Sequence, residues 1–502
     1  MFLSSLLWKK QSTDSSPKPK KPRAVRVRDI PQGFDKTALK REIEDLLSAN
    51  PKDDDVRVLD LSLVHTTSSL SYACVTFSSL PAKLAALDKE TVEEIRLGDL
   101  LFDTKFLGIT PVFEGPAQTE PVVDIIAVPG LGSHPLGSWK ATNGHDVWLR
   151  DFLPQDVPNV RVLLYGYDTT LNRDDWTLSI GDIAEHFLRS VVAFRRYTRS
   201  SDRKIIFVAH SLGGLVVKEA LVRAREGEND RHKLSLLRDC AGLLFFGVPN
   251  LGLRNDSLRT LVKNQPNEQL VQDLVVYKES EAPSYLKMLA RRFTECCKGY
   301  YIPAVAIFER KLSYTVRKGA DGAIIKDGMR KLLVTEESAT NIGLPESEVI
   351  KIPFLRDHSS LVKFSSRSDM DYIQILDHIK QFTAAPWIPT AKKKYVDVLR
   401  EAERVVSDVG RCIVDAEKEL FRGQSMASPF MEQERVAPNS DCSWITVSSG
   451  QGKSSICKNS AESIGNKTVD DSQSASVSFY SGRMSQAYRD AETVARSAIL
   501  KL

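Results

Sequence analysis

The stretch that decides the fold is KIIFVAHSLGGLVVKEALVRAR, residues 204–225. Its apolar beginning, KIIFVAH, predicts a buried β-strand, and the residues after Ser211 have the apolar spacing of a helix. A serine between a strand and a helix is typical of the nucleophile elbow, a sharp turn that exposes the hydroxyl at a helix N-terminus. The turn needs small residues two positions before and after the serine, where Ala209 and Gly213 stand. The alternative is a serine that only caps a helix in a non-catalytic α/β fold.

From Val122 onward, near-continuous apolar runs alternate with long helical stretches. Strands that are buried on both faces of a parallel sheet have this composition. Together with the elbow, the runs predict an α/β-hydrolase domain over residues 116–385. The runs are VVDIIAV (122–128), VRVLLYG (160–166), KIIFVAH (204–210), AGLLFFGVP (241–249) and PAVAIF (303–308).

The general base of this fold is a histidine beyond the last strand, because the chain order is serine, acid, histidine. His358 follows the apolar run VIKIPF (349–354) and occupies that place. His378 lies in a helical stretch, where we expect a surface residue, and we expect His210 to point away from the serine. His134 lies in a loop near the site and is a candidate substrate contact.

The acid should follow the strand that precedes the histidine's strand. The run PAVAIF ends at Phe308, so Glu309 is the first candidate. Glu336 and Glu337 remain open as rivals. Asp357 is adjacent to the histidine and poorly placed, because neighbouring side chains diverge.

An oxyanion hole needs two backbone N–H donors. We expect one from Leu212, directly after the nucleophile, and the other from Leu131 in the loop VPGLGSHP. Gly130 and Gly132 would let that loop approach a substrate, although an ordinary glycine-rich turn is the alternative. These groups predict acyl transfer from an ester to Ser211 and then to water, a chemistry that needs no metal or organic cofactor.

Several segments, in this order, resemble the SERAC-like, lipase-like serine hydrolases: VPGLGSHPLGSW (128–139), VWLRDFLP (147–154), VLLYGYD (162–168), IIFVAHSLGGLVVKEAL (205–221), LLFFGVPNLG (243–252) and DHSSLVKFS (357–365). The resemblance implies Ser211, His358 and Glu309 as the triad and a lipid or small ester as substrate. It also implies an association with the mitochondrion or the endoplasmic reticulum. Pro129 and Asn250 depart from histidines that many relatives carry, which bears on substrate rather than on chemistry.

Residues 24–115 predict a ferredoxin-like domain of β-α-β-β-α-β order, an arrangement also found in RNA-recognition modules. Such modules stack bases on aromatic residues of the central strands. Here Tyr72 is present, but Cys74 and Arg26 stand where the other aromatics are expected. We therefore expect protein contacts through this domain and no specific nucleic-acid binding. The predicted elements are strands VRVRDI (25–30), VRVLDLSLVH (56–65), SYACVTF (71–77) and LFDTKFL (101–107), and helices 36–49 and LPAKLAALDK (80–89).

Both ends of the chain predict other structures. Residues 1–23 read as a disordered basic tail whose start, MFLSSLLWKK, could make a weak peripheral membrane contact. Residues 386–440 predict a helical linker. Residues 441–502 resemble the start of a P-loop segment of the NACHT type, with Gly452, Lys453 and Ser454 as nucleotide-binding candidates and Val447 replacing the first glycine of the motif. That segment keeps open a second function, an NLR-like signalling protein in which the hydrolase domain is an effector or a scaffold.

Composition limits the class of protein and its compartment. Apolar residues make up 42% and charged residues 27% of the 502 residues, which is ordinary for a globular protein. A net charge of +4 is too small to imply nucleic acid. The seven cysteines are odd in number and scattered, which favours a reducing compartment and therefore an intracellular, cytoplasmic location. No stretch approaches the roughly 20 apolar residues of a membrane span.

Overall fold

The computed structural model describes residues 22–384 except for 48–55, 67–69, 90, 117–119, 169–176, 228–229, 277–280 and 319–323. All described residues belong to one compact unit of the chain. Residues 1–21 of the predicted basic tail, the helical linker and the phosphate loop with Gly452, Lys453 and Ser454 lie outside the described residues. Arg23, which the sequence placed in the tail, begins the first strand.

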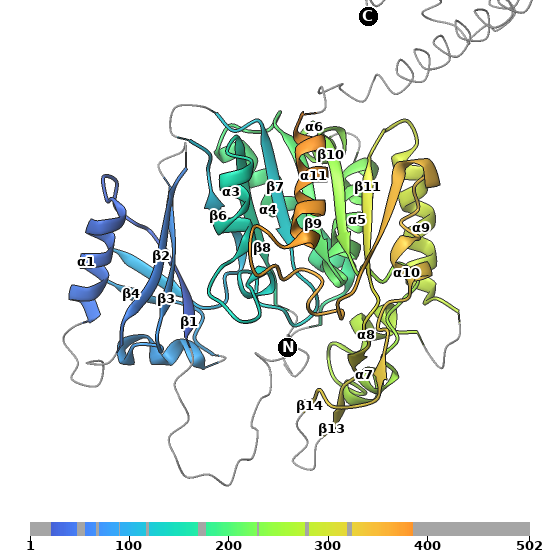
Figure 1. Ribbon diagram of the computed structural model, residues 1–502, viewed down its shortest axis with the longest axis horizontal. Coiled ribbons are helices and arrows are strands. Elements are labelled where there is room, and N and C mark those ends of the chain that lie inside the picture. Colours follow the sequence, from blue (N-terminus) through green and yellow to red (C-terminus); the bar gives the residue numbers. More distant parts are fainter. Residues whose placement is uncertain are drawn as a thin grey trace, which may run out of the picture. The chain divides into compact units, whose positions relative to one another are not determined.

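A large mixed sheet forms the centre of the described structure (Figure 1). Its strand order is β16-β11-β10-β9-β7-β8-β6, and all neighbours are parallel except the outermost strand β6, which is antiparallel to β8. The five predicted apolar runs form its five central strands. The strands are β6 (Gly108–Phe113), β7 (Val123–Val128), β8 (Val160–Gly166), β9 (Lys204–His210), β10 (Cys240–Phe246), β11 (Ala304–Glu309) and β16 (Val349–Phe354).

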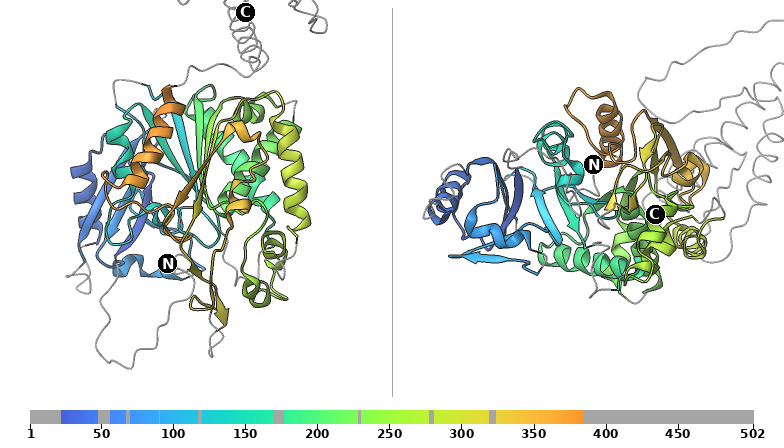
Figure 2. Two further views of the ribbon diagram at one scale, coloured as in Figure 1. Left: turned by 45° about the vertical axis from the view of Figure 1, so that its right-hand side comes forward. Right: turned by 90° about the horizontal axis from the view of Figure 1, so that it is seen from below.

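Helices cover both faces of the large sheet (Figure 2). Alternate residues of β7 show the two layers, because Ile126 and Val128 pack into one apolar cluster while Ile125 and Ala127 pack into the other. With its parallel core and the serine elbow, this arrangement is the α/β-hydrolase fold. One face carries α4 (Ile180–Tyr197), α5 (Leu212–Glu226), α6 (Arg231–Arg238) and α9 (Ser284–Cys297); the other carries α2 (Trp148–Asp151), α3 (Leu153–Asp156) and α11 (Met370–Ala384).

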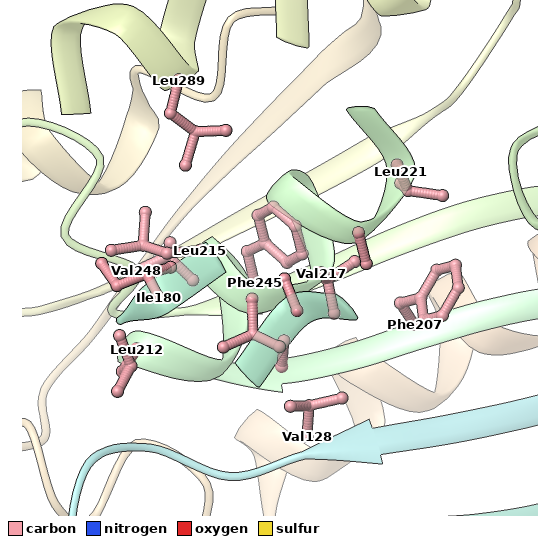
Figure 3. Close-up of a cluster of buried hydrophobic side chains, with 14 of the residues drawn as sticks. Val128, Ile180, Phe207, Leu212, Leu215, Val217, Leu221, Phe245, Val248 and Leu289 are labelled. Carbon is pink, nitrogen blue, oxygen red and sulfur yellow. The ribbon is translucent and has the colours of Figure 1, made fainter. Parts of the chain in front are cut away.

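Helix α5 is buried over most of its length. It lies against the sheet, with Leu212, Leu215 and Leu221 among Phe207, Phe245 and Val248 (Figure 3). A helix that is apolar on nearly all sides belongs in a core. Each fully buried large apolar side chain contributes about 1.5–3 kcal/mol to stability, so the residue at the head of this helix is held rigidly.

The N-terminal residues form a second, five-stranded antiparallel sheet of order β2-β3-β1-β5-β4. Two details differ from the sequence expectation. The stretch 80–89 forms a 3₁₀ helix, because Pro81 precedes it and only Leu84 and Leu87 are buried, too few for a packed α-helix. The last predicted strand is shorter and pairs with an unexpected strand, β4. The elements are β1 (Arg23–Arg28), α1 (Lys36–Leu47), β2 (Val58–His65), β3 (Ser71–Phe77), η2 (Ala82–Asp88), β4 (Ile95–Leu97) and β5 (Leu100–Asp103).

Strand β6 joins the two sheets. The expected boundary at residue 115 placed it in the N-terminal domain, but it pairs with β8 of the large sheet. Pro111 inside the strand hid it from sequence reasoning, since proline is confined to the outer strands of sheets. Cys74 of β3 belongs to the same apolar cluster as Val112 of β6, and Arg26 of β1 donates to the Thr110 hydroxyl at 2.7 Å. This face of the N-terminal sheet is therefore covered by the large sheet's outermost strand.

The connections at the carboxyl ends of the strands carry the remaining elements. In Figure 1, β13 and β14 lie beside α7 and α8 beyond the lower end of the large sheet. No described helix is both long and apolar enough to cross a membrane. The elements are η3 (Gly137–Trp139), α7 (Asp256–Leu261), α8 (Glu268–Leu274), β12 (Ser313–Tyr314), β13 (Arg317–Lys318), β14 (Ile324–Ile325), β15 (Arg330–Lys331), α10 (Glu336–Thr340) and η4 (Glu346–Glu348).

Candidate active site

Ser211 sits at the turn between β9 and α5 in a strained backbone conformation. Its φ is +53° and its ψ is −126°, a region that residues with a Cβ rarely adopt. Its N–H donates to the carbonyl of Phe246 at 2.9 Å, and its own carbonyl accepts from the N–H of Gly214 at 3.0 Å. These bonds to β10 and to the first turn of α5 hold the strain in place, as the elbow requires.

The glycine after the elbow is required by a close approach of the backbone. A Cβ at position 213 would lie 2.4 Å from the carbonyl oxygens of Val128 and Pro129, at the end of β7. A Cβ at position 130 would lie 2.9 Å from the Cβ of Ser211. Because Gly130 and Gly213 lack that atom, the loop after β7 passes directly beside the serine.

His358 and Glu309 form a buried hydrogen-bonded pair. Nδ1 of His358 lies 2.7 Å from Oε2 of Glu309, the last residue of β11, and only 1% of Glu309 is exposed. The other carboxylate oxygen of Glu309 accepts from the N–H groups of Leu333 and Val334. Two backbone donors and one imidazole thus hold the carboxylate, which leaves Nε2 of His358 as the ring atom available for chemistry.

The same turn of β10 meets both the serine and the histidine. The N–H of Ser211 bonds to Phe246, and the next residue, Gly247, has φ +55°. A Cβ at position 247 would lie 3.0 Å from the imidazole of His358. The structure therefore brings Ser211, His358 and Glu309 to one place at the carboxyl ends of β9, β10 and β11.

His210 is a site residue that sequence reasoning missed, because we expected it to point away. Its ring centroid lies 4.9 Å from that of His358, and its Nε2 lies 2.9 Å from the His358 carbonyl oxygen. A carbonyl only accepts, so Nε2 of His210 carries the proton. Burial, together with the neighbouring His358, holds the pKa of His210 well below its usual value. His210 is thus a neutral support for the backbone of His358.

The rival acids occupy other positions. Glu336 and Glu337 begin helix α10, where carboxylates favour the helix N-terminus, and Glu336 forms an ion pair with Arg310 at 2.6 Å. The carboxylate of Asp357 accepts from the N–H groups of Ser359 and Ser360, which shapes the turn after β16. None of these carboxylates has a hydrogen bond to His358 among the contacts of the described residues. His378 lies in α11, away from the histidine pair's hydrogen bonds.

The expected oxyanion donors flank Ser211. Leu212 is the first residue of α5, and Leu131 lies in the turn after β7, where Gly132 has φ +60°. Tyr167 was not predicted and fixes this loop, because its hydroxyl donates to the Pro129 carbonyl at 2.6 Å. Apolar surroundings raise the pKa of Tyr167 well above its usual range, so the hydroxyl keeps its proton.

The prediction of His134 as a substrate contact is wrong. Its Nδ1 accepts from the N–H groups of Leu136 and Gly137 at 3.2 and 3.1 Å, and its Nε2 lies 2.9 Å from the Thr104 carbonyl oxygen. Both ring nitrogens are therefore used within the protein. The ring also packs edge-on against Phe106. The sequence shows a histidine near the site but cannot show the N-terminal segment that occupies its polar atoms.

Known proteins resemble this chain over a region that contains the elbow. Residues 159–275, which include the elbow, match the family described as "Putative serine esterase (DUF676)". Human protein SERAC1 is 23% identical over 324 residues, and zebrafish (Danio rerio) protein SERAC1 is 33% identical over 116 residues. Over these residues the chain is similar to the SERAC-like serine esterases, and we call this part of the chain the SERAC-like domain. The human alignment covers 60% of this chain and 44% of that protein, and the zebrafish alignment covers 21% and 16%. The chain therefore spans less than half the length of the curated relatives it matches.

Solved structures that resemble the SERAC-like domain include lipases. The mature lipase BlEst2 of Bacillus licheniformis is 16% identical, with a TM-score of 0.33, and the alignment covers 55% of this chain and 97% of that one. Phospholipase PlaB of Legionella pneumophila is 13% identical, with a TM-score of 0.33 and coverage of 57% and 62%. The α/β-hydrolase fold of the SERAC-like domain follows from its strand order and its serine elbow, independently of these likenesses.

Proposed function

We propose that this chain is a serine hydrolase that cleaves carboxylic esters of lipid-like molecules through an acyl-enzyme at Ser211. The observation that carries the proposal is the buried contact of 2.7 Å between His358 Nδ1 and Glu309 Oε2, next to a serine on a strained elbow. A carboxylate bonded to Nδ1 of an imidazole, beside a serine on an elbow, is the arrangement that acyl transfer requires. The lipase-like family resemblance supports an acyl chain on the substrate.

The reaction follows from these positions. Nε2 of His358 accepts the proton of Ser211 as the Ser211 Oγ attacks the ester carbonyl carbon. The oxygen of the tetrahedral intermediate accepts hydrogen bonds from the N–H groups of Leu212 and Leu131. The imidazolium, stabilised by Glu309, returns the proton to the departing alcohol. Water, deprotonated by His358, then attacks the acyl group, and Ser211 is regenerated.

A fluorophosphonate probe tests the nucleophile without knowledge of the substrate. We expect one strongly labelled serine in the whole chain, and loss of labelling and of ester turnover in Ser211→Ala. Ser365→Ala is the matched control, because Ser365 is exposed and outside the site. Labelling that persists in Ser211→Ala, with the fold intact by circular dichroism, would contradict the assignment.

The N-terminal sheet is proposed as a ferredoxin-like domain that supports the hydrolase. The residues that suggested the signalling alternative lie outside the described part of the chain, and the described site favours the hydrolase. An association with a membrane of the mitochondrion or the endoplasmic reticulum stays a proposal that rests on the family resemblance. A protein partner of the N-terminal sheet would have to use surface that β6 does not cover.

A further inference from the structure

A buried lysine lies in α5, the helix that begins directly after the elbow. Lys218 is 1% exposed, and its Nζ donates to Oδ1 of Asn250 at 2.8 Å. The amine also lies 5.1 Å from the centroid of the Phe293 ring, and no carboxylate of the described residues forms an ion pair with it. Burial lowers the pKa of Lys218 to about 7. A buried amine is unfavourable unless it is hydrogen-bonded, so Asn250 is the residue that stabilises it here.

The side chain of Asn250 joins α5 to α10. Its Nδ2 donates to the carbonyls of Val248 and Ala339 at 3.3 and 3.2 Å. An amine donates and a carbonyl only accepts, so Oδ1 must face Lys218 and Nδ2 must face the two carbonyls. Only 1% of Asn250 is exposed. Its amide therefore links α5, the loop after β10 (residues 247–255) and α10 in one fixed orientation.

Two further contacts fasten α10 to the loop after β10. The Ser338 hydroxyl accepts from the N–H of Leu251 at 3.0 Å and donates to the Gly252 carbonyl at 3.2 Å. The N–H of Arg254 donates to the Leu333 carbonyl at 2.8 Å. A helix of five residues is too short to be stable by itself, so these contacts determine where α10 lies.

The segment that leads into α10 holds the proposed catalytic acid. The N–H groups of Leu333 and Val334 donate to Oε1 of Glu309, whose Oε2 bonds to Nδ1 of His358. Thr335, the next residue, is the N-cap of α10. A shift of α10 would therefore move the two N–H groups away from the carboxylate that they hold.

The loop after β10 is also packed against the beginning of α5. A Cβ at position 214, in the first turn of that helix, would lie 2.2 Å from a methyl group of Val248, so Gly214 admits this close contact. Lys218 lies about one turn further along the same helix. The loop is thus held to α5 at two points. The N–H groups that hold the acid are in this way positioned relative to the helix that presents Ser211.

We propose that Lys218 and Asn250 are positioning residues for the acid of the triad: through α10 they set the two N–H groups that hold the Glu309 carboxylate against His358. The contacts themselves do not depend on ester turnover, whereas their effect on catalysis rests on the proposed function. Lys218→Met removes the donor and leaves Oδ1 of Asn250 buried without a partner. That loss should let α10 shift, because an unsatisfied buried amide is unfavourable.

Steady-state kinetics on an activated, soluble ester measures the effect. Lys218→Met should lose roughly ten- to a hundred-fold in kcat with little change in KM, because a small displacement of a catalytic group slows the reaction without altering substrate contacts. Asn250→Asp should lose a similar factor, since it keeps an acceptor for Lys218 but has no N–H for the Ala339 carbonyl. If Lys218→Met does not fold, Asn250→Asp replaces it in each measurement.

The matched control disturbs a buried hydrogen bond elsewhere in the hydrolase domain. Thr198→Val removes the bond of 2.9 Å between the Thr198 hydroxyl and Arg161, near the amino end of β8 and therefore at the opposite end of the sheet from the site. This variant should have a lower unfolding temperature but an unchanged kcat at temperatures where it is folded. A loss of kcat in Thr198→Val equal to that in Lys218→Met would mean that general destabilisation explains both, and would overturn the proposal.

A double-mutant cycle shows whether the loss acts through the acid. In Glu309→Gln, the added Lys218→Met should lower kcat by less than roughly two-fold, because the group that Lys218 positions has already been replaced. Equal factors with and without Glu309→Gln would overturn the proposal. Full kcat in both Lys218→Met and Asn250→Asp would do the same.

Proton NMR separates the positioning role from the proposed function. A hydrogen bond between an imidazole and a carboxylate gives a resonance far downfield, which is identified by its loss in Glu309→Gln. In Lys218→Met this resonance should move upfield and exchange faster with water, while Thr198→Val should leave it in place. Such a change in a protein that neither turns over esters nor reacts with a fluorophosphonate would refute the hydrolase and leave the positioning role standing. An unchanged resonance in both Lys218→Met and Asn250→Asp would refute the positioning role in an active enzyme.

Discussion

His134 lies 2.9 Å, through its Nε2, from the carbonyl oxygen of Thr104, and this contact ties the oxyanion loop to the N-terminal segment. Its Nδ1 accepts two backbone N–H groups of the same loop, so the ring must be neutral with its proton on Nε2. The loop that carries Leu131 is therefore held from outside the hydrolase sheet. Residues far apart in the sequence thus position the loop that carries the proposed oxyanion donor.

The first prediction concerns acid stability. Burial lowers the pKa of His134 to about 4, below its usual value near 6.5, so the unfolded chain binds a proton there that the folded chain does not. This group's contribution is fully present above pH 6.5 and is lost as pH falls from 6.5 to about 4. The thermal unfolding midpoint should fall across that window. His134→Asn should have a lower unfolding midpoint than the wild type at pH 7, but its midpoint should fall less between pH 6.5 and about 4. Parallel plots of the midpoint against pH for the two proteins would contradict this prediction.

The second prediction concerns the strained elbow. A non-glycine residue in this conformation destabilises the folded state by about 1–3 kcal/mol. Glycine removes that strain, but it makes the unfolded chain more flexible and so lowers the free energy of unfolding by up to about 1 kcal/mol. Ser211→Gly should therefore unfold at a higher temperature than Ser211→Ala, which keeps the Cβ. Both variants lack the hydroxyl, so the comparison isolates the backbone. A lower midpoint for the glycine variant would show that the turn is not strained.

The third prediction assigns the acid. In Glu309→Gln the amide can donate to Nδ1 of His358 and so favour the wrong tautomer. Ester turnover should fall by about three to four orders of magnitude. Glu336→Gln, which removes an exposed charge paired with Arg310, is the control and should retain turnover. Steady-state kinetics on one soluble ester shows which carboxylate is the acid. A large loss of turnover in Glu336→Gln, with turnover retained in Glu309→Gln, would make Glu336 of α10 the acid.

The fourth prediction concerns His210. His210→Phe keeps a ring against His358 but removes the hydrogen bond to its carbonyl. We expect kcat to fall roughly ten-fold with little change in KM, the effect of one lost hydrogen bond on the placement of the base. Because burial keeps His210 neutral, the acid limb of the wild-type pH profile of kcat/KM should fit a single proton. A limb that needs two protons in the wild type and one in His210→Phe would show that His210 titrates with its neighbour.

The fifth prediction concerns RNA. The face of the N-terminal sheet that would stack bases holds Cys74 and Arg26 and is covered by β6. The whole chain should show no sub-micromolar, sequence-dependent affinity for single-stranded RNA at physiological salt. Weak binding through the basic first residues should vanish as salt rises. Filter binding at two salt concentrations measures this, and salt-resistant binding would mean that β6 can leave the sheet.

The local parts of the site could be predicted from the sequence. The elbow depends on a short motif, and the fixed chain order of the fold made His358 the candidate base and Glu309 the first candidate acid. Glu336 and Glu337 stayed open as rivals, because sequence alone does not show which carboxylate contacts the imidazole. The roles of His210, of Tyr167 and of Ser313, whose hydroxyl accepts the N–H of His358 at 3.0 Å, were not predictable. Each acts by contacting a residue brought near by the sheet, and no spacing in the sequence records such a contact.

The same reason explains the errors in the N-terminal part. Amphipathic spacing found α1 and the central strands, which bury one face locally. It overestimated the helix at 80–89, whose short buried side cannot support α-helical packing. It placed the boundary after β6, because a strand with an internal proline shows its partner only in three dimensions.

Strand β6 also determines how the chain can be shortened. Cutting at the domain boundary that the sequence suggests, before residue 116, would leave β8 with a row of unpaired N–H and C=O groups. An open edge of this kind, beside apolar surface that Cys74 now covers, is a template for strand addition by other molecules. A hydrolase prepared without its first 115 residues should therefore aggregate more readily than one that begins at Gly108, in which β6 still pairs with β8.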